Sequence, residues 1–184
     1  MSIFDTPIDR RDSDSIKWGK YAGRDILPMW VADMDFAAPP GVLAALHTRI
    51  EHGIFGYGSA WPSLTESVLA HLESEYAWRI EAEWLVWLPG LVSGLNIACC
   101  AVDGAVLTTT PVYPPFLSAP KFSGRHLQQA ALACRNGRWE MDKNALADAL
   151  TEDTGLFLLC HPHNPTGRCW QREELLDLAD FART

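Results

Sequence analysis

The sequence Cys-His-Pro-His-Asn-Pro-Thr-Gly at residues 160–167 follows the apolar run Gly-Leu-Phe-Leu-Leu at residues 155–159. The length and flanks of that run are typical of a buried strand in a parallel sheet. The loop after it therefore lies at the carboxyl end of a strand, where ligands bind in α/β proteins. Pro162 and Pro165 each disfavour the helical backbone conformation for the residue before them, so we expect His161 and Asn164 to be held extended. Alone, the loop is equally consistent with a turn that ends the strand.

The same segment contains four potential metal ligands, Cys160, His161, His163 and Cys169. Their spacings match none of the usual zinc patterns, and two prolines stiffen the backbone between them. We therefore expect no metal site.

Composition limits the kind of partner. The 184 residues are 48% hydrophobic and carry a net charge of −8 without a basic cluster. This balance disfavours nucleic acid and anionic membranes and favours a small-molecule ligand. No apolar stretch is long enough to cross a bilayer, residues 1–11 lack the apolar centre of a signal peptide, and five cysteines show no Cys-x-x-Cys spacing. We expect a cytoplasmic protein with free, mostly buried thiols.

Strand and helix patterns alternate along the chain after an irregular arm at residues 1–40. We expect helices at residues 40–51, 61–79, 91–102, 114–118, 142–150 and 171–183, and strands at residues 84–88, 104–110, 126–133 and 155–159. The apolar stripe of the second helix is expected in the core. Strands separated by helices indicate an α/β fold with a mainly parallel sheet and flanking helices.

A glycine turn, Pro89-Gly90, separates an expected strand from a helix that starts Leu91-Val92-Ser93. Unpaired amides and the helix dipole at such a start favour an anion such as phosphate. A structural alternative is that Gly90 and Gly94 merely allow close packing of the helix on the sheet.

Tyr113 follows the next expected strand and stands among three prolines, at positions 111, 114 and 115. A ring held with so little freedom can stack on a flat heteroaromatic ligand. A tyrosine that simply fills a turn is the other interpretation.

Together with the segments Gly56-Tyr57-Gly58, 15–18 and 27–36, these motifs resemble the fold-type I pyridoxal-phosphate (PLP) enzymes, most closely the MalY/PatB-type cystathionine β-lyases. The resemblance implies PLP as cofactor, with Asn164 on its 3′-oxygen and Tyr113 stacked on its ring. It assigns the phosphate to Gly90, Leu91, Val92 and Ser93 and, from the neighbouring subunit, to Tyr57, which implies a homodimer. It places Trp30 and Ala32 at the substrate. Asp33 and Asp35 are read as loop and capping residues.

By the same resemblance, residues 41–184 form the amino-terminal portion of an incomplete PLP-binding large domain, and residues 1–40 form an arm or part of the small domain. The Schiff-base lysine is then expected beyond Thr184, since Lys17, Lys20, Lys121 and Lys143 all lack the family's Ser-x-x-Lys context. We therefore expect no catalytic residue within the chain and no activity from the chain alone.

The resemblance implies a PLP-dependent carbon–sulfur β-lyase that converts a sulfur amino acid into a thiol, pyruvate and ammonia. Phe36 and the segment around Trp30 favour the lyase over a class I/II aminotransferase, which shares every other motif. A non-catalytic remnant or partner-binding protein is the third possibility. An unpaired sheet edge in such a chain predicts poor solubility or folding that depends on a partner.

Overall fold

The computed structural model describes residues 3–6 and 8–183, and the chain forms two compact units, residues 1–59 and 60–184. No helix among the described residues is both long enough and apolar enough to span a bilayer. The predicted division between residues 40 and 41 concerns the family's domains and stays a prediction.

The amino-terminal unit is mostly irregular, as predicted for residues 1–40. It contains the 3-10 helix η1 (Ile3–Asp5), the short helix α1 (Ile16–Gly19) and the longer helix α2 (Pro40–His52). Pro40 occupies the first turn of α2, and Gly53 ends the helix in the left-handed conformation with φ of 74°. The predicted helix is confirmed. Its apolar side chains Val42, Leu43, Leu46 and Ile50 are exposed within this unit.

The second unit carries the sheet. Its elements are α3 (Pro62–Tyr76), η2 (Ala82–Trp84), α4 (Leu91–Cys100), β1 (Ala105–Thr110), α5 (Pro115–Phe122), β2 (Leu127–Ala131), β3 (Ala133–Arg135), β4 (Arg138–Glu140), α6 (Lys143–Ala149), β5 (Thr154–Leu158) and α7 (Arg172–Phe181). Strands β2, β1 and β5 lie in this order and run parallel. The predicted α/β class and parallel sheet are confirmed.

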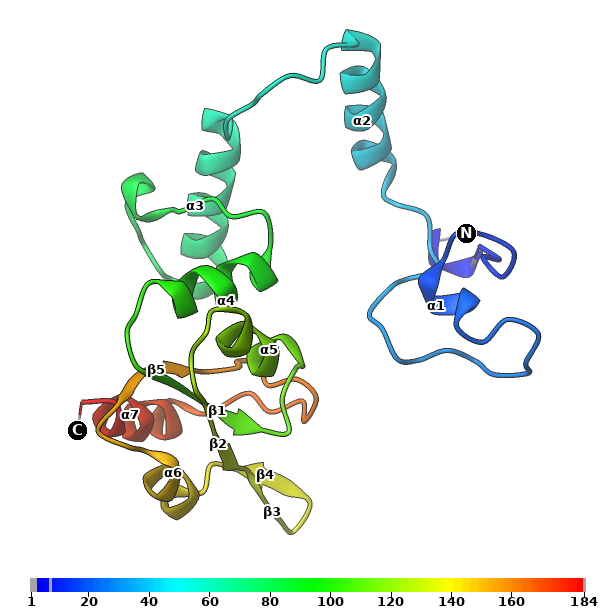
Figure 1. The fold of residues 1–184 in the computed structure, drawn as a ribbon. Coiled ribbons are helices and arrows are strands. Elements are labelled where there is room, and N and C mark those ends of the chain that lie inside the picture. Colours follow the sequence, from blue (N-terminus) through cyan, green and yellow to red (C-terminus); the bar gives the residue numbers. More distant parts are fainter. Residues whose placement is uncertain (1–2, 7, 184) are drawn as a thin grey trace. The chain divides into compact units, whose positions relative to one another are not determined.

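Two hydrophobic clusters cover the two faces of the sheet. Because side chains alternate along β1, Val106 packs with residues of α4 and α5, whereas Leu107 packs with residues of α6 and α7. Figure 1 shows these two helix pairs on opposite sides of the sheet. The result is a three-layer arrangement centred on β1.

The predicted strand at residues 84–88 is wrong. Residues 82–84 form η2, and Leu85 to Leu88 pair with no strand in the described part of the chain. Both edges of β1 are already occupied, by β2 and β5. An apolar run becomes a strand only where a partner supplies its backbone hydrogen bonds, and a local pattern does not reveal that partner.

Three smaller predictions also differ from the structure. Helix α3 ends at Tyr76, with Ala77 left-handed, and none of its residues is buried, so its apolar stripe is not core in this unit. The thiols are free as predicted, but Cys100, Cys134 and Cys169 are exposed, and only Cys99 and Cys160 are buried. The hairpin of β3 and β4 was not predicted, although Asn136-Gly137 is a common hairpin turn and both residues have positive φ.

Candidate functional site

The carboxyl ends of β1 and β5 lie side by side because the two strands are parallel neighbours with Thr108 opposite Leu158. The Thr108 hydroxyl donates a hydrogen bond to the Leu158 carbonyl oxygen across 3.0 Å in the buried sheet. Tyr113 follows β1 and is half-buried against the cluster of α4, α5, β1 and β5. Asn164 follows β5 and is exposed. Two predicted site residues therefore stand at the same edge of the sheet.

The amino terminus of α4 belongs to that edge as well. Helix α4 leads into β1 through a short turn and packs on it through Leu95 and Cys99, so the helix starts where the strand ends. Its first hydrogen bond runs from the Gly94 amide to the Gly90 carbonyl oxygen, 3.1 Å away, and the preceding amides of the first turn have no helical acceptor. These amides belong to Leu91, Val92 and Ser93.

Gly90 and Gly94 differ in what they permit. Gly90 has φ of 138°, which only glycine adopts readily, and a Cβ there would meet nothing within 4 Å. A Cβ on Gly94 would lie 3.2 Å from the Leu88 side chain, so close packing is the clearer role of Gly94. The open space around Gly90 leaves the first turn of α4 accessible.

The loop that carries Asn164 is closed on itself. The His163 amide donates to the Arg168 carbonyl oxygen at 2.7 Å, and the Gly167 amide donates to the His163 carbonyl oxygen at 2.8 Å. The Asn164 amide donates to the Cys160 Sγ atom at 3.3 Å. The Asn164 carboxamide has no hydrogen-bond partner among residues 3–6 and 8–183, so it is available to a ligand.

Arg168 ties this loop to the rest of the unit, a role that the sequence reading missed. Its guanidinium donates to the Trp139 carbonyl oxygen at 2.7 Å and pairs with the Glu174 carboxylate at 2.5 Å. Glu174 also accepts from the Gln171 amide as half of a capping box at the start of α7. In the sequence, the Gln-x-x-Glu spacing of Gln171 and Glu174 was the signal that could have predicted this capping box, to which Arg168 is paired.

Three of the four potential metal ligands make other contacts, and the fourth, Cys169, is exposed. Cys160 lies in the core, His161 Nδ1 is 3.3 Å from the Trp170 amide, and His163 Nδ1 is 3.0 Å from the Thr166 hydroxyl. Over the described ranges, no three His, Cys, Asp or Glu side chains gather as a metal site would require.

The remaining predicted site residues lie in the amino-terminal unit. Tyr57 is fully exposed, in the segment after α2. Trp30 is 45% exposed, with its ring 4.2 Å from the Lys20 Nζ atom. Ala32 lines an open pocket of about 580 Å³ together with Lys17 and Phe36.

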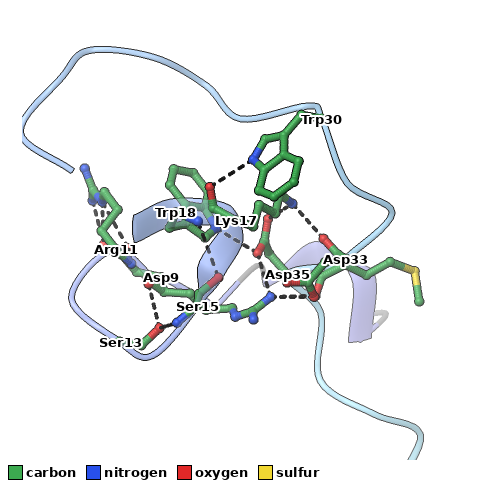
Figure 2. Close-up of polar contacts among 11 residues, drawn as sticks. Asp9, Arg11, Ser13, Ser15, Lys17, Trp18, Trp30, Asp33 and Asp35 are labelled. Carbon is green, nitrogen blue, oxygen red and sulfur yellow. Dashed lines mark hydrogen bonds and ion pairs between the residues drawn. The ribbon is translucent and has the colours of Figure 1, made fainter. Parts of the chain in front are cut away.

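A polar cluster beside Ala32 was not predicted (Figure 2). Asp35 accepts hydrogen bonds from Lys17 Nζ at 2.7 Å and Trp18 Nε1 at 2.9 Å, and Asp33 pairs with Arg10 at 2.8 Å. The hydrogen bonds from Lys17 and then Trp18 hold the pKa of Asp35 below its ordinary value. Both aspartates therefore organise the arm as anions, which is more than the expected turn and capping roles.

The chain is similar in sequence and in fold to several known proteins. Residues 24–184 match the aminotransferase class I and II family. Cystathionine beta-lyase PatB of Bacillus subtilis (strain 168) is 37% identical over 97% of this chain and 48% of its own length. The crystal structure of OvoB is 46% identical, with a TM-score of 0.90 over 98% of this chain and 48% of that one. A PLP-bound putative aminotransferase from Clostridium difficile 630 is 37% identical, with a TM-score of 0.84 over 96% and 48%. The chain thus spans about half the length of these relatives, and its fold is that of fold-type I PLP enzymes.

Proposed function

The chain belongs to the aminotransferase class I and II family, and we propose from this that it forms part of a PLP-dependent carbon–sulfur β-lyase. The reaction would convert a sulfur amino acid into a thiol, pyruvate and ammonia. The similarity to cystathionine beta-lyase PatB over nearly the whole chain supports the lyase.

The observation that carries the proposal is the gathering of three kinds of group at one edge of the sheet. The free amides of the first turn of α4, the half-buried ring of Tyr113 and the unengaged carboxamide of Asn164 all follow from the topology of α4, β1 and β5. An anion site, an aromatic face and a hydrogen-bond donor are what a phosphorylated pyridine ring requires. The residues present therefore fit PLP.

In this proposal, the amides of Leu91, Val92 and Ser93 bind the phosphate, with Gly90 providing the open approach. Tyr113 contacts the face of the ring, and the Asn164 carboxamide donates to the 3′-oxygen. Bound PLP supplies an electron sink for charge that develops at the substrate α-carbon. Trp30 and Ala32 would contact the substrate.

We further propose that the complete protein is a homodimer in which Tyr57 binds the phosphate held by the neighbouring subunit. The exposure of Tyr57 and of the apolar face of α2 supports a partner surface in this part of the chain. Residues 41–184 would be the amino-terminal portion of the large domain. The five free cysteines support a cytoplasmic location.

We propose that the chain alone does not turn over substrate. Lys17 is held by the Asp35 carboxylate and the Asp33 carbonyl oxygen, and Lys143 pairs with Asp177 at 2.7 Å. Lys20 lies over Trp30, and Lys121 sits in the last turn of α5. Lys121 and Lys143 are the two lysines in the unit that carries Asn164, and neither has a hydrogen bond or ion pair with Asn164 in the described part of the chain.

An aminotransferase is the second candidate, because the PLP-bound Clostridium difficile 630 protein is described as a putative aminotransferase and is as similar in sequence as PatB. The two activities differ in product, since a lyase releases pyruvate, whereas an aminotransferase passes the amino group to a 2-oxo acid.

A chimera distinguishes these candidates. The chain is joined to the part of PatB that it does not match, and this chimera is assayed with cystathionine, PLP and a 2-oxo acid other than pyruvate as amino acceptor. We expect pyruvate and thiol, with kcat/KM reduced about 10–100-fold by Asn164→Ala, the loss expected for a hydrogen bond to a charged group. Asn144→Ala, on the exposed surface of α6, is the matched control. Amino-group transfer without pyruvate would contradict the lyase.

A further inference from the structure

The residue before Asn164 is almost completely buried. The His163 side chain is 2% exposed, and its ring packs edge-on against Trp170 with centroids 5.6 Å apart. Asn164 itself is exposed. The loop therefore has an anchored residue directly beside the one that presents its carboxamide.

The chemistry of the anchor is unusual for its surroundings. His163 Nε2 is buried and has no hydrogen-bond partner in the described part of the chain. An unpaired buried polar atom lowers stability, whereas a leucine or phenylalanine would fill the space without that cost. The other ring nitrogen, in contrast, has a hydrogen-bond partner.

That other nitrogen, His163 Nδ1, lies 3.0 Å from the Thr166 hydroxyl. His163 and Thr166 flank the dipeptide Asn164-Pro165, so their hydrogen bond closes a side-chain clamp across it. Backbone hydrogen bonds from His163 to Arg168 and from Gly167 to His163 fix the clamp to the loop. The base of the loop is held independently by the Arg168 contacts with Trp139 and Glu174.

We infer that His163 and Thr166 are positioning residues: their hydrogen bond clamps Asn164-Pro165 and fixes the backbone from which the Asn164 carboxamide is presented. The effect of the clamp on PLP binding rests on the proposed function. The clamp itself is a property of the chain without the cofactor. Binding costs less conformational entropy when the backbone that carries the carboxamide is already ordered than when the ligand must order it.

The test uses the full chain with Thr166→Val, which removes the hydroxyl and keeps the shape, and Thr166→Ser, which restores the hydroxyl. The first measurement is the NMR order parameter of the Asn164 backbone amide without PLP. We expect a lower order parameter in Thr166→Val and the original value in Thr166→Ser. An unchanged value in Thr166→Val overturns the clamp, whether or not PLP binds. If Thr166→Val does not fold, the smaller Thr166→Ala is measured in the same way.

The second measurement is a double-mutant cycle on PLP affinity with Asn164→Ala. We expect Thr166→Val to weaken binding about threefold to tenfold in the original chain and to have little further effect in Asn164→Ala, because the clamp acts through that carboxamide. Additive losses would show a general structural role and overturn the inference. A chain that binds no PLP refutes the proposed function, while the NMR measurement still decides the clamp.

Discussion

The backbone amide of Asn164 donates a hydrogen bond to the Cys160 Sγ atom, and the same sulfur lies 3.6 Å from the Pro162 carbonyl oxygen. A buried thiol thus holds the start of the loop that presents the Asn164 carboxamide. The loop is fixed to the hydrophobic core, since Cys160 packs with α4, α5 and β1.

Cys160→Ala should lower the free energy of unfolding by about 1–3 kcal/mol, because it leaves the Asn164 amide without its acceptor and removes a buried sulfur. Cys169→Ala is the control, since Cys169 is exposed and its loss should change stability by less than about 0.5 kcal/mol. Urea unfolding measures both. Equal effects would show that the sulfur contact contributes nothing.

Gly155 should tolerate no side chain. A Cβ there would overlap the Asp103 carbonyl oxygen, and a Cβ on Gly104 would overlap that of Asp153, so the loop before β1 meets the start of β5 backbone to backbone. We expect Gly155→Ala to destabilise the chain by more than about 2 kcal/mol. Gly41→Ala, which meets nothing within 4 Å, should be harmless. A Gly155→Ala chain with unchanged thermal unfolding would contradict the close approach.

Stability should fall in mildly acidic solution through His163. Burial holds the pKa of this ring below its ordinary value of 6.5, because the charged form is poorly solvated there. The folded state then binds fewer protons than the unfolded state. The stability that neutral His163 contributes is therefore complete above pH 6.5, and it is lost as the pH falls from 6.5 through the lower folded pKa. Unfolding midpoints between about pH 5 and pH 8 should show this slope, and His163→Phe should flatten it. Parallel curves for the two chains would refute the assignment.

The amino-terminal arm should respond in a more acidic range. The hydrogen bonds from Lys17 and Trp18 lower the pKa of Asp35 from 3.8, so the stability that they supply is present above 3.8 and is lost as the pH falls through the folded value. At neutral pH, Asp35→Asn should accelerate hydrogen exchange of the Trp18 indole N–H. Asp9→Asn, which affects only an exposed pair with Arg11, should leave that rate unchanged. The account fails if both variants behave alike.

The local sequence predicted those elements whose signals are local. The expected helices at residues 40–51 and 142–150 and the expected strand at residues 155–159 agree with α2, α6 and β5 to within one residue at each end, because their signals act within a few residues. The strand predicted at residues 84–88 was wrong because a strand needs a partner that is distant in the sequence. The prediction that the apolar stripe of α3 lies in the core was wrong for a related reason, since burial depends on which other segment covers that face of the helix.

The candidate site was predictable only as positions along the chain. Alternation of strands and helices implied that Tyr113 and Asn164 lie at one edge, and the structure confirms this placement. The contacts that hold the loop could not be predicted from the sequence. The Arg168 hydrogen bond to Trp139 and the burial of His163 depend on residues that only the fold brings together. The roles of the site residues toward PLP stay predictions.

The most direct test of the PLP site is a titration of the purified chain with PLP, followed by absorbance and by borohydride reduction. We predict saturable, non-covalent binding that Asn164→Ala weakens about tenfold or more and Asn144→Ala leaves unchanged, with none of the four lysines specifically modified. Binding that is equal in all three chains, or a single lysine labelled on reduction, would contradict the account.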